Sequence, residues 1–174
     1  FCFINNAAVT ARYLQSKFNI NKIAIIDFDV HHGNGTQEIF YNDKSVFYGS
    51  IHQHPLFPGT GVEAETGVGN IFNAPISSDT TRDKFMEIFE TKILKNVDLF
   101  EPEVILISAG FDAHTRDPLA SINLESEDYY TLTQNIVEIA KRHSNGRVIS
   151  FLEGGYDLQA LSECIEAHLE ALSN

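Results

Sequence analysis

Short apolar runs alternate along this chain with longer segments in which apolar residues recur every three or four positions. The short runs predict strands at 22–28, 45–51, 103–109 and 147–152. The periodic segments predict helices at 5–18, 35–42, 81–98, 126–143 and 157–172. Strands separated by helices indicate a parallel sheet with helices on both faces. The pattern therefore predicts an α/β protein, a three-layer α/β/α fold with a mostly parallel sheet, in a single domain spanning 1–174.

Local signals refine two helix starts and one connection. Thr80, followed three residues later by Asp83, resembles a capping box, and Ser126 is the predicted N-cap of its helix. Residues 52–70 are rich in Gly and His and are expected to form a long loop. Loops of that length inside a compact domain are often functional.

Composition narrows the class of protein. The chain has 174 residues, of which 43% are hydrophobic and 21% charged, and this suits one globular domain. The formal net charge of -12 argues against nucleic-acid binding, which requires a basic face. No apolar stretch approaches the roughly 20 residues of a membrane span, and no signal peptide is visible. With two cysteines, Cys2 and Cys164, interpreted as reduced thiols, a cytoplasmic protein is expected.

The start of the chain is abrupt. It begins at Phe1, within an apolar segment, and its one methionine is Met86. We therefore expect a fragment cut inside a domain, with the possibility that a catalytic group lies upstream.

Acidic side chains and a histidine follow the first predicted strand. Alternation along that strand places Asp27, Asp29 and His31 on one side, at the strand's end. Asp112 follows the strand at 103–109, and in parallel α/β sheets sites form at the carboxyl ends of the strands. Two carboxylates and an imidazole that converge there suit a divalent cation better than a core.

Asp29, His31 and Asp112 are therefore the predicted metal ligands. This donor set leaves a fourth position open, as a catalytic Zn²⁺ or Fe²⁺ site requires, and it does not choose between these metals. The alternative is that Asp112 caps a turn and His31 packs in the core. A two-metal site of the arginase type would need an acid two residues after the histidine, where this chain has Gly33.

Three further residues are candidates for roles beside the metal. Asp27 is interpreted as a carboxylate behind the ligands, one that orients a histidine or helps to hold a monovalent cation. A buried carboxylate satisfied by backbone N–H groups is equally compatible. Tyr156 follows two glycines, and its O–H could donate to a developing oxyanion, although a surface tyrosine after a turn would look the same. Phe57, on the Gly-rich loop, could wall a substrate channel.

Four motifs together resemble those of the zinc-dependent histone deacetylase family. They are DFDVHHGNG at 27–35, FPGTG at 57–61, SAGFDA at 108–113 and LEGGY at 152–156. They occur in the family's order and with similar spacing over essentially the whole chain. The Glu-Gly-Gly-Tyr form resembles the class II and bacterial deacetylase-like amidohydrolase branch, which also contains acetylpolyamine amidohydrolases. The resemblance implies the arginase/deacetylase fold, with its N-terminal strands missing here.

The resemblance also implies roles for individual residues. Zn²⁺ would be bound by Asp29, His31 and Asp112, and Tyr156 would polarise the amide carbonyl. A structural K⁺ or Na⁺ would be held by Asp27, Asp29, His31, Ser50 and the carbonyl of Ile51. A second monovalent cation would use carbonyls near Phe40, Asp43 and Val46. The acyl-lysine tunnel would be walled by Phe1 and Phe57, with Gly155 beside it.

One element of the family's pattern is absent. Its tandem histidines, the general base and acid, would lie shortly before Phe1, and Asp27 and Asn34 are the positions that would orient them. The resemblance therefore implies that the intact protein is catalytic. The 174 residues alone are expected to bind metal poorly and to turn over little.

The expected function is removal of acetyl groups from acetyl-lysine proteins or peptides by a zinc-activated water. An acetylpolyamine or other small-amide hydrolase is the first alternative, although no acidic residue follows Pro118 in Leu119-Ala120-Ser121 to mark one. A non-catalytic module that binds acetylated ligands is the second alternative. Neither a nucleic acid nor a membrane is an expected partner, and the sequence leaves open whether the protein is a homo-oligomer.

Overall fold

The computed structural model describes residues 3–174 and contains one five-stranded sheet in the order β3-β2-β1-β4-β5. All four strand pairings are parallel, as the alternation of strands and helices predicts. The strands are β1 (Ile23–Asp27), β2 (Val46–Gln53), β3 (Ile71–Ile76), β4 (Val104–Ala109) and β5 (Val148–Leu152). Because the strands are parallel, their carboxyl ends meet at one edge of the sheet.

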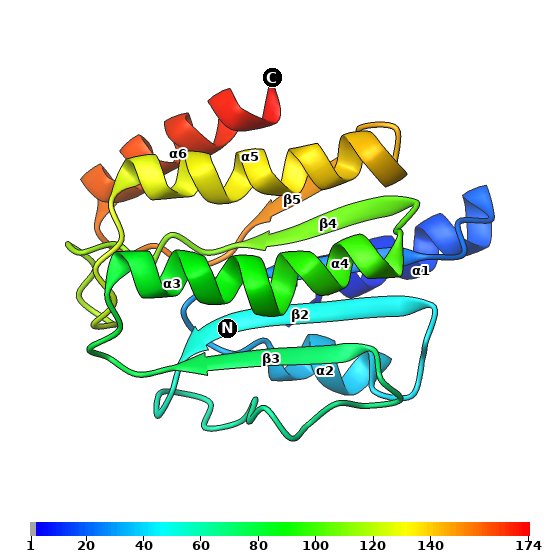
Figure 1. Cartoon of the computed structure of the whole chain (residues 1–174), viewed down its shortest axis with the longest axis horizontal. Helices are drawn as coiled ribbons and strands as arrows, with labels where there is room; N and C mark the ends of the chain where they lie inside the picture. Colours follow the sequence, from blue (N-terminus) through cyan, green and yellow to red (C-terminus); the bar gives the residue numbers. More distant parts are fainter. Residues whose placement is uncertain (1–2) are drawn as a thin grey trace.

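Helices cover both faces of this sheet (Figure 1). The helices on one face are α1 (Asn6–Phe18) and α2 (Asn34–Phe40). The elements on the other face are α3 (Arg82–Ile88), the π-helical segment η1 (Phe89–Leu94), α4 (Lys95–Phe100), α5 (Ser126–His143) and α6 (Leu158–Leu172). The molecule is thus the three-layer α/β/α arrangement that the sequence predicts.

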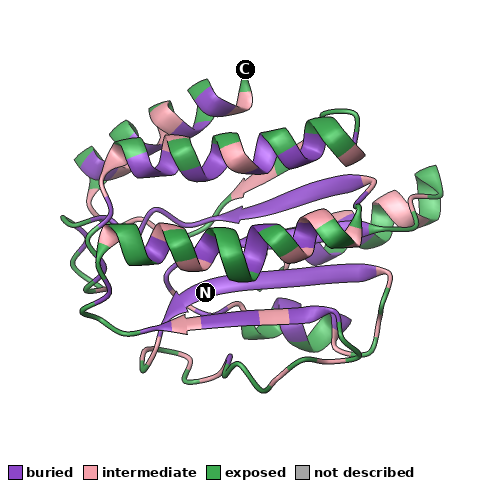
Figure 2. Ribbon diagram, viewed as in Figure 1, coloured by how far each residue is buried: buried purple, intermediate pink, exposed green. Residues whose placement is uncertain are grey.

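Alternation along β1 divides its side chains between the two layers. Ile23 and Ile25 pack with α1 and α2, whereas Ala24 and Ile26 belong to the larger core beneath α3, α5 and α6. Every residue of β1 is buried, which is usual for a central strand of a parallel sheet. Figure 2 shows β2 and β4 buried along their lengths, while the helices present an exposed stripe outward.

The predicted helices and strands are confirmed with small shifts at their ends, but β3 was missed. Residues 71–76 have no predicted element, and Asn73 and Pro75 interrupt their apolar pattern. Proline removes a backbone donor, which an edge strand tolerates. Within residues 3–174, β3 is such an edge strand, since its one neighbour in the sheet is β2. The loop predicted from residue 52 also starts later, because β2 continues to Gln53.

Both predicted helix caps were wrong by one residue. Thr81, not Thr80, caps α3, and its side chain accepts the N–H of Lys84. Glu125, not Ser126, caps α5 in a reciprocal capping box with Asp128. In each case the observed cap lies one position away from the residue that the pattern favoured. The cap is the residue whose side chain reaches the unpaired N–H groups of the first turn.

The helix predicted at 81–98 is continuous but not uniform. It runs as α3, η1 and α4, with a π-helical turn between the two α-helical parts. Phe85, Phe89, Ile93 and Val97 all remain buried along it. Among the described residues, no helix is both long and apolar enough to cross a membrane.

Candidate metal centre

Asp29 joins the loop after β1 to the segment after β5. Its Oδ1 accepts the backbone N–H of His31 at 2.8 Å, and its Oδ2 accepts the backbone N–H of Gly154 at 2.8 Å. These bonds fix the carboxylate at the carboxyl edge of the sheet, where the strand alternation predicted it. They also hold the loop in a tight turn over the end of β1.

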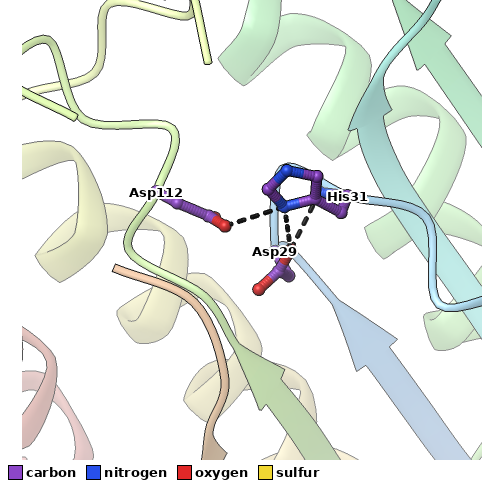
Figure 3. Close-up of side chains that lie close together, drawn as sticks. All are labelled: Asp29, His31 and Asp112. Atoms are coloured by element: carbon purple, nitrogen blue, oxygen red, sulfur yellow. Dashed lines mark hydrogen bonds and ion pairs between the residues drawn. The ribbon is translucent and has the colours of Figure 1, made fainter. Parts of the chain in front are cut away.

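Asp112 reaches the same point from the loop after β4. Its side chain is completely buried, its Oδ1 accepts the N–H of Val30 at 2.9 Å, and its Oδ2 lies 3.0 Å from Nδ1 of His31. The same Nδ1 lies 3.2 Å from Oδ1 of Asp29. Figure 3 shows the imidazole facing both carboxylates, with Asp112 on the loop after β4 and the other two residues on the segment after β1.

The three side chains fit the donor set of a divalent metal. One ligand atom from each of Asp29, His31 and Asp112 lies within 4.8 Å of the others. The backbone is shaped around them, because a Cβ added at Gly154 would overlap Asp112 Oδ2 and stand 2.6 Å from Asp29 Oδ2. The fold thus brings together the three residues that were predicted as ligands. The residue beside them, Gly154, has no side chain that would displace their oxygens.

The electrostatics of the group favour one positive charge at its centre. The hydrogen bond to Asp112, with that to Asp29 next, raises the pKa of His31 to about 10. Burial raises the pKa of Asp112, and the neighbouring Asp29 charge acts in the same direction. Two carboxylates and an imidazole at this distance therefore hold a proton among them, and a metal cation can serve in its place.

Asp27, the last residue of β1, lies next to this group, is buried, and is also part of the lining of the cavity described below. Its Oδ1 accepts the N–H of Asp29 at 3.1 Å, and its Oδ2 accepts the hydroxyl of Tyr48 at 2.8 Å. The Tyr48 oxygen in turn accepts the N–H of Gly33 at 3.1 Å. Burial and the Asp29 charge raise the pKa of Asp27. Sequence reasoning missed Tyr48, since nothing in an apolar strand marks one tyrosine as a partner of a remote carboxylate.

A cavity of about 500 Å³ lies beside the candidate ligands Asp29, His31 and Asp112, referred to below as the metal group. Its lining includes Asp29, His31, Asn34, Phe57, Gly154 and Tyr156. The predicted tunnel residue Phe57 is 65% exposed at its mouth and Tyr156 is 41% exposed. Gly155 instead turns the chain with φ +135, where an added Cβ would stand 2.7 Å from Leu161 Cδ1. Phe1, the other predicted wall, lies outside the described residues.

Asp117 fixes the backbone at Tyr156. Its Oδ2 accepts the N–H of Tyr156 at 2.8 Å, and its Oδ1 accepts the N–H of Leu119 at 2.9 Å. Nothing in the sequence pattern predicts this role for Asp117. An Asp-Pro pair that precedes a loop indicates a turn, and only the fold shows that the turn reaches the segment after β5.

The residues predicted to hold monovalent cations are also placed. Asp27 is opposite Ser50 in the β1–β2 register, and Ser50 Oγ lies 2.9 Å from Nδ1 of His52. Ile51 follows in β2 and is fully buried. The carbonyls predicted for a second cation, those of Phe40, Asp43 and Val46, do converge, and all three accept from the side chain of Asn70.

Comparison with known proteins gives one consistent result. A family model described as "Histone deacetylase domain" matches residues 1–172. Histone deacetylase 14, chloroplastic, of Arabidopsis thaliana is 40% identical over 176 residues, which cover 99% of this chain and 42% of that protein. A "Probable deacetylase" of Archaeoglobus fulgidus is 41% identical over 163 residues, 91% of this chain and 45% of that protein.

The similarity extends to a solved structure. The crystal structure of the HDA15 HD domain superposes with a TM-score of 0.92 and 39% identity, covering 99% of this chain and 49% of that one. The chain therefore spans less than half the length of each of these three relatives.

Proposed function

Because the chain belongs to the histone deacetylase family, we propose that the protein containing it hydrolyses the amide bond of acetyl-lysine in proteins or peptides. The observation that carries the proposal is the group of Asp29, His31 and Asp112 beside a cavity whose lining includes Asp29, His31 and Tyr156. The activity proposed is that of the whole protein, since the resemblance assigns proton transfer to a histidine pair expected before Phe1.

In this proposal Asp29, His31 and Asp112 hold Zn²⁺, and Fe²⁺ would accept the same donors. When bound, such an ion supplies a water of lowered pKa and polarises a carbonyl oxygen. The three side chains would provide two oxygens and one nitrogen, so a four-coordinate ion would keep one position for water or substrate. Asp27 and Ser50, with the carbonyl of Ile51, are proposed to hold a monovalent cation behind this centre.

Tyr156 has the position and chemistry of an oxyanion donor. It lines the cavity that the metal group also lines, and its phenol O–H can donate to an oxygen that becomes negative during amide hydrolysis. Asp117 holds its backbone N–H, so the side chain starts from a fixed point of the chain. Phe57 presents an apolar ring at the mouth, which suits the methylene stem of an acylated lysine.

The test is Tyr156→Phe in the full-length protein, assayed on an acetyl-lysine peptide with and without a zinc chelator. Loss of one oxyanion donor removes about 3 kcal/mol of transition-state stabilisation, so kcat should fall at least tenfold while KM changes little. Tyr13→Phe, on the exposed side of α1, is the matched control and should leave both constants unchanged.

Two results would contradict the proposal. A kcat of Tyr156→Phe within twofold of the wild-type value would remove the oxyanion role. Chelator-sensitive hydrolysis of acetylputrescine, without hydrolysis of any acetyl-lysine peptide, would replace the proposed substrate class with small acetylated amines.

A further inference from the structure

Three backbone carbonyls point at one buried side chain between α2 and β2. They belong to Phe40 at the end of α2, Asp43 in the following turn and Val46 at the start of β2. Asn70, which directly precedes β3 and is 4% exposed, places its Nδ2 at 2.9, 3.1 and 2.8 Å from these oxygens. Such a ring of carbonyl oxygens is the ligand set that a desolvated monovalent cation would take.

The orientation of the Asn70 amide is fixed by its other end. Its Oδ1 accepts the backbone N–H of Val68 at 3.1 Å. A flipped amide would aim Oδ1 at three carbonyl oxygens and Nδ2 at an N–H, so the hydrogen-bond network selects one orientation. The turn also encloses Oδ1 tightly, because a Cβ at Gly67 would stand 2.7 Å from it.

These carbonyl oxygens accept the Asn70 amide in addition to the backbone hydrogen bonds of their own turn. The Phe40 oxygen already accepts the N–H of Asp43 at 3.0 Å, and the Asp43 oxygen accepts the N–H of Val46 at 3.1 Å. An amide nitrogen carries only two hydrogens, so at least one must be shared among the three oxygens. Nδ2 therefore occupies the point of convergence itself, and a cation coordinated by the same three oxygens would overlap it.

We propose that the Asn70 side-chain amide stands in for a monovalent cation at this point, so that the carbonyls of Phe40, Asp43 and Val46 bind neither K⁺ nor Na⁺. This disagrees with the second cation site that the resemblance to the deacetylase family implies. The amide is covalently attached, so its presence does not depend on salt concentration, whereas stabilisation by a bound ion does. The junction of α2, β2 and β3 is thus held together without an ion.

The direct test is anomalous diffraction from crystals of the full-length protein grown with Tl⁺ in place of K⁺. Wild-type protein should show no thallium peak between the three carbonyls, and Asn70→Ala should show one there. A wild-type peak at the carbonyls, with the asparagine turned away, would overturn the proposal. A folded Asn70→Ala protein with no thallium at that point would overturn it as well.

A solution measurement covers the case in which the variant does not crystallise. The thermal midpoint is compared in KCl and in tetramethylammonium chloride at equal ionic strength. Asn70→Ala should gain a K⁺-dependent rise at least about 3 °C larger than that of the wild type. The matched control is Asn73→Ala, which removes another buried amide whose Nδ2 donates to Gln37 and Glu65, and it should gain none. Equal K⁺ responses in all three proteins would contradict the proposal, whatever their enzymatic activity.

Discussion

In the proposed metal site, His31 is the residue whose protonation state matters most. Its Nδ1 faces oxygens of Asp112 and Asp29 at 3.0 and 3.2 Å, which is why its pKa is raised to about 10. A metal ion requires the neutral imidazole, so metal binding competes with this proton. The same carboxylates that stabilise the proton would stabilise a cation in its place.

Gly154→Ala tests whether the backbone beside the ligands is shaped for a metal. The new Cβ would overlap Asp112 Oδ2 and approach Asp29 Oδ2, so the ligand oxygens must move apart. We expect zinc affinity to fall at least about tenfold, a result that competition with a chromogenic chelator can measure.

The matched control is Gly35→Ala, in the first turn of α2 on the same cavity. An added Cβ there has nothing within 4 Å, so zinc affinity should stay at the wild-type value. Equal affinities for the two variants would show that the Gly154 backbone does not constrain the ligands.

The candidate metal ligands could be predicted from the sequence, whereas the residues that hydrogen-bond to the surrounding segments could not. Asp29, His31 and Asp112 could be found because strand ends in a parallel sheet converge and because carboxylate and imidazole are metal donors. Tyr48 and Asn70 could not, since each role consists of contacts with residues far away in the sequence. Tyr48 binds a carboxylate 21 positions earlier, and Asn70 binds a carbonyl 30 positions earlier.

At the scale of elements, the strand and helix pattern predicted the sheet but not its edge. The buried strands β1 and β4 are apolar throughout, and such runs are readable from sequence. β3 is an edge strand with polar and proline positions, so its assignment depends on pairing with β2, which no local pattern encodes. The one-residue errors at the two helix caps have a different cause. Several residues near each helix start could accept the first N–H groups, and the sequence does not show which one does.

His168 ties α6 to α5 and β5 and makes that packing sensitive to pH. Its Nδ1 and Nε2 lie 2.6 and 2.8 Å from the hydroxyl oxygens of Thr133 and Ser150, and burial lowers its pKa to about 4. Between pH 4 and 6.5 the unfolded chain, in which this histidine has its ordinary pKa near 6.5, binds more protons than the folded chain. The stabilisation is therefore complete above pH 6.5 and is lost as the pH falls toward 4.

The predicted effect of this histidine is a loss of about 3 kcal/mol of unfolding free energy between pH 6.5 and 4. His168→Gln, which stays neutral, should show a shallower decline over that range in urea unfolding. Some decline should remain, because burial also lowers the pKa of His52, to about 3. A decline as steep as that of the wild type would mean that His168 does not carry the effect.

For the whole molecule, the site exists only in the folded chain. Asp29 and His31 come from the end of β1, Asp112 comes from the end of β4, and the N–H of Gly154 after β5 holds the first of them in place. An ion that binds this arrangement and not the unfolded chain must stabilise the fold. Measured metal content and measured stability therefore both test whether these residues form a metal site.

The most direct test is the zinc content of the purified full-length protein, measured together with its thermal midpoint before and after chelation. We expect one zinc per chain and a lower thermal midpoint after chelation. Asp112→Asn should lose both the zinc and the chelator effect, while Asp79→Asn, at a loop carboxylate away from the site, should keep both. Stoichiometric zinc in Asp112→Asn, with an unchanged response to chelator, would contradict the assignment of Asp29, His31 and Asp112 as the metal centre.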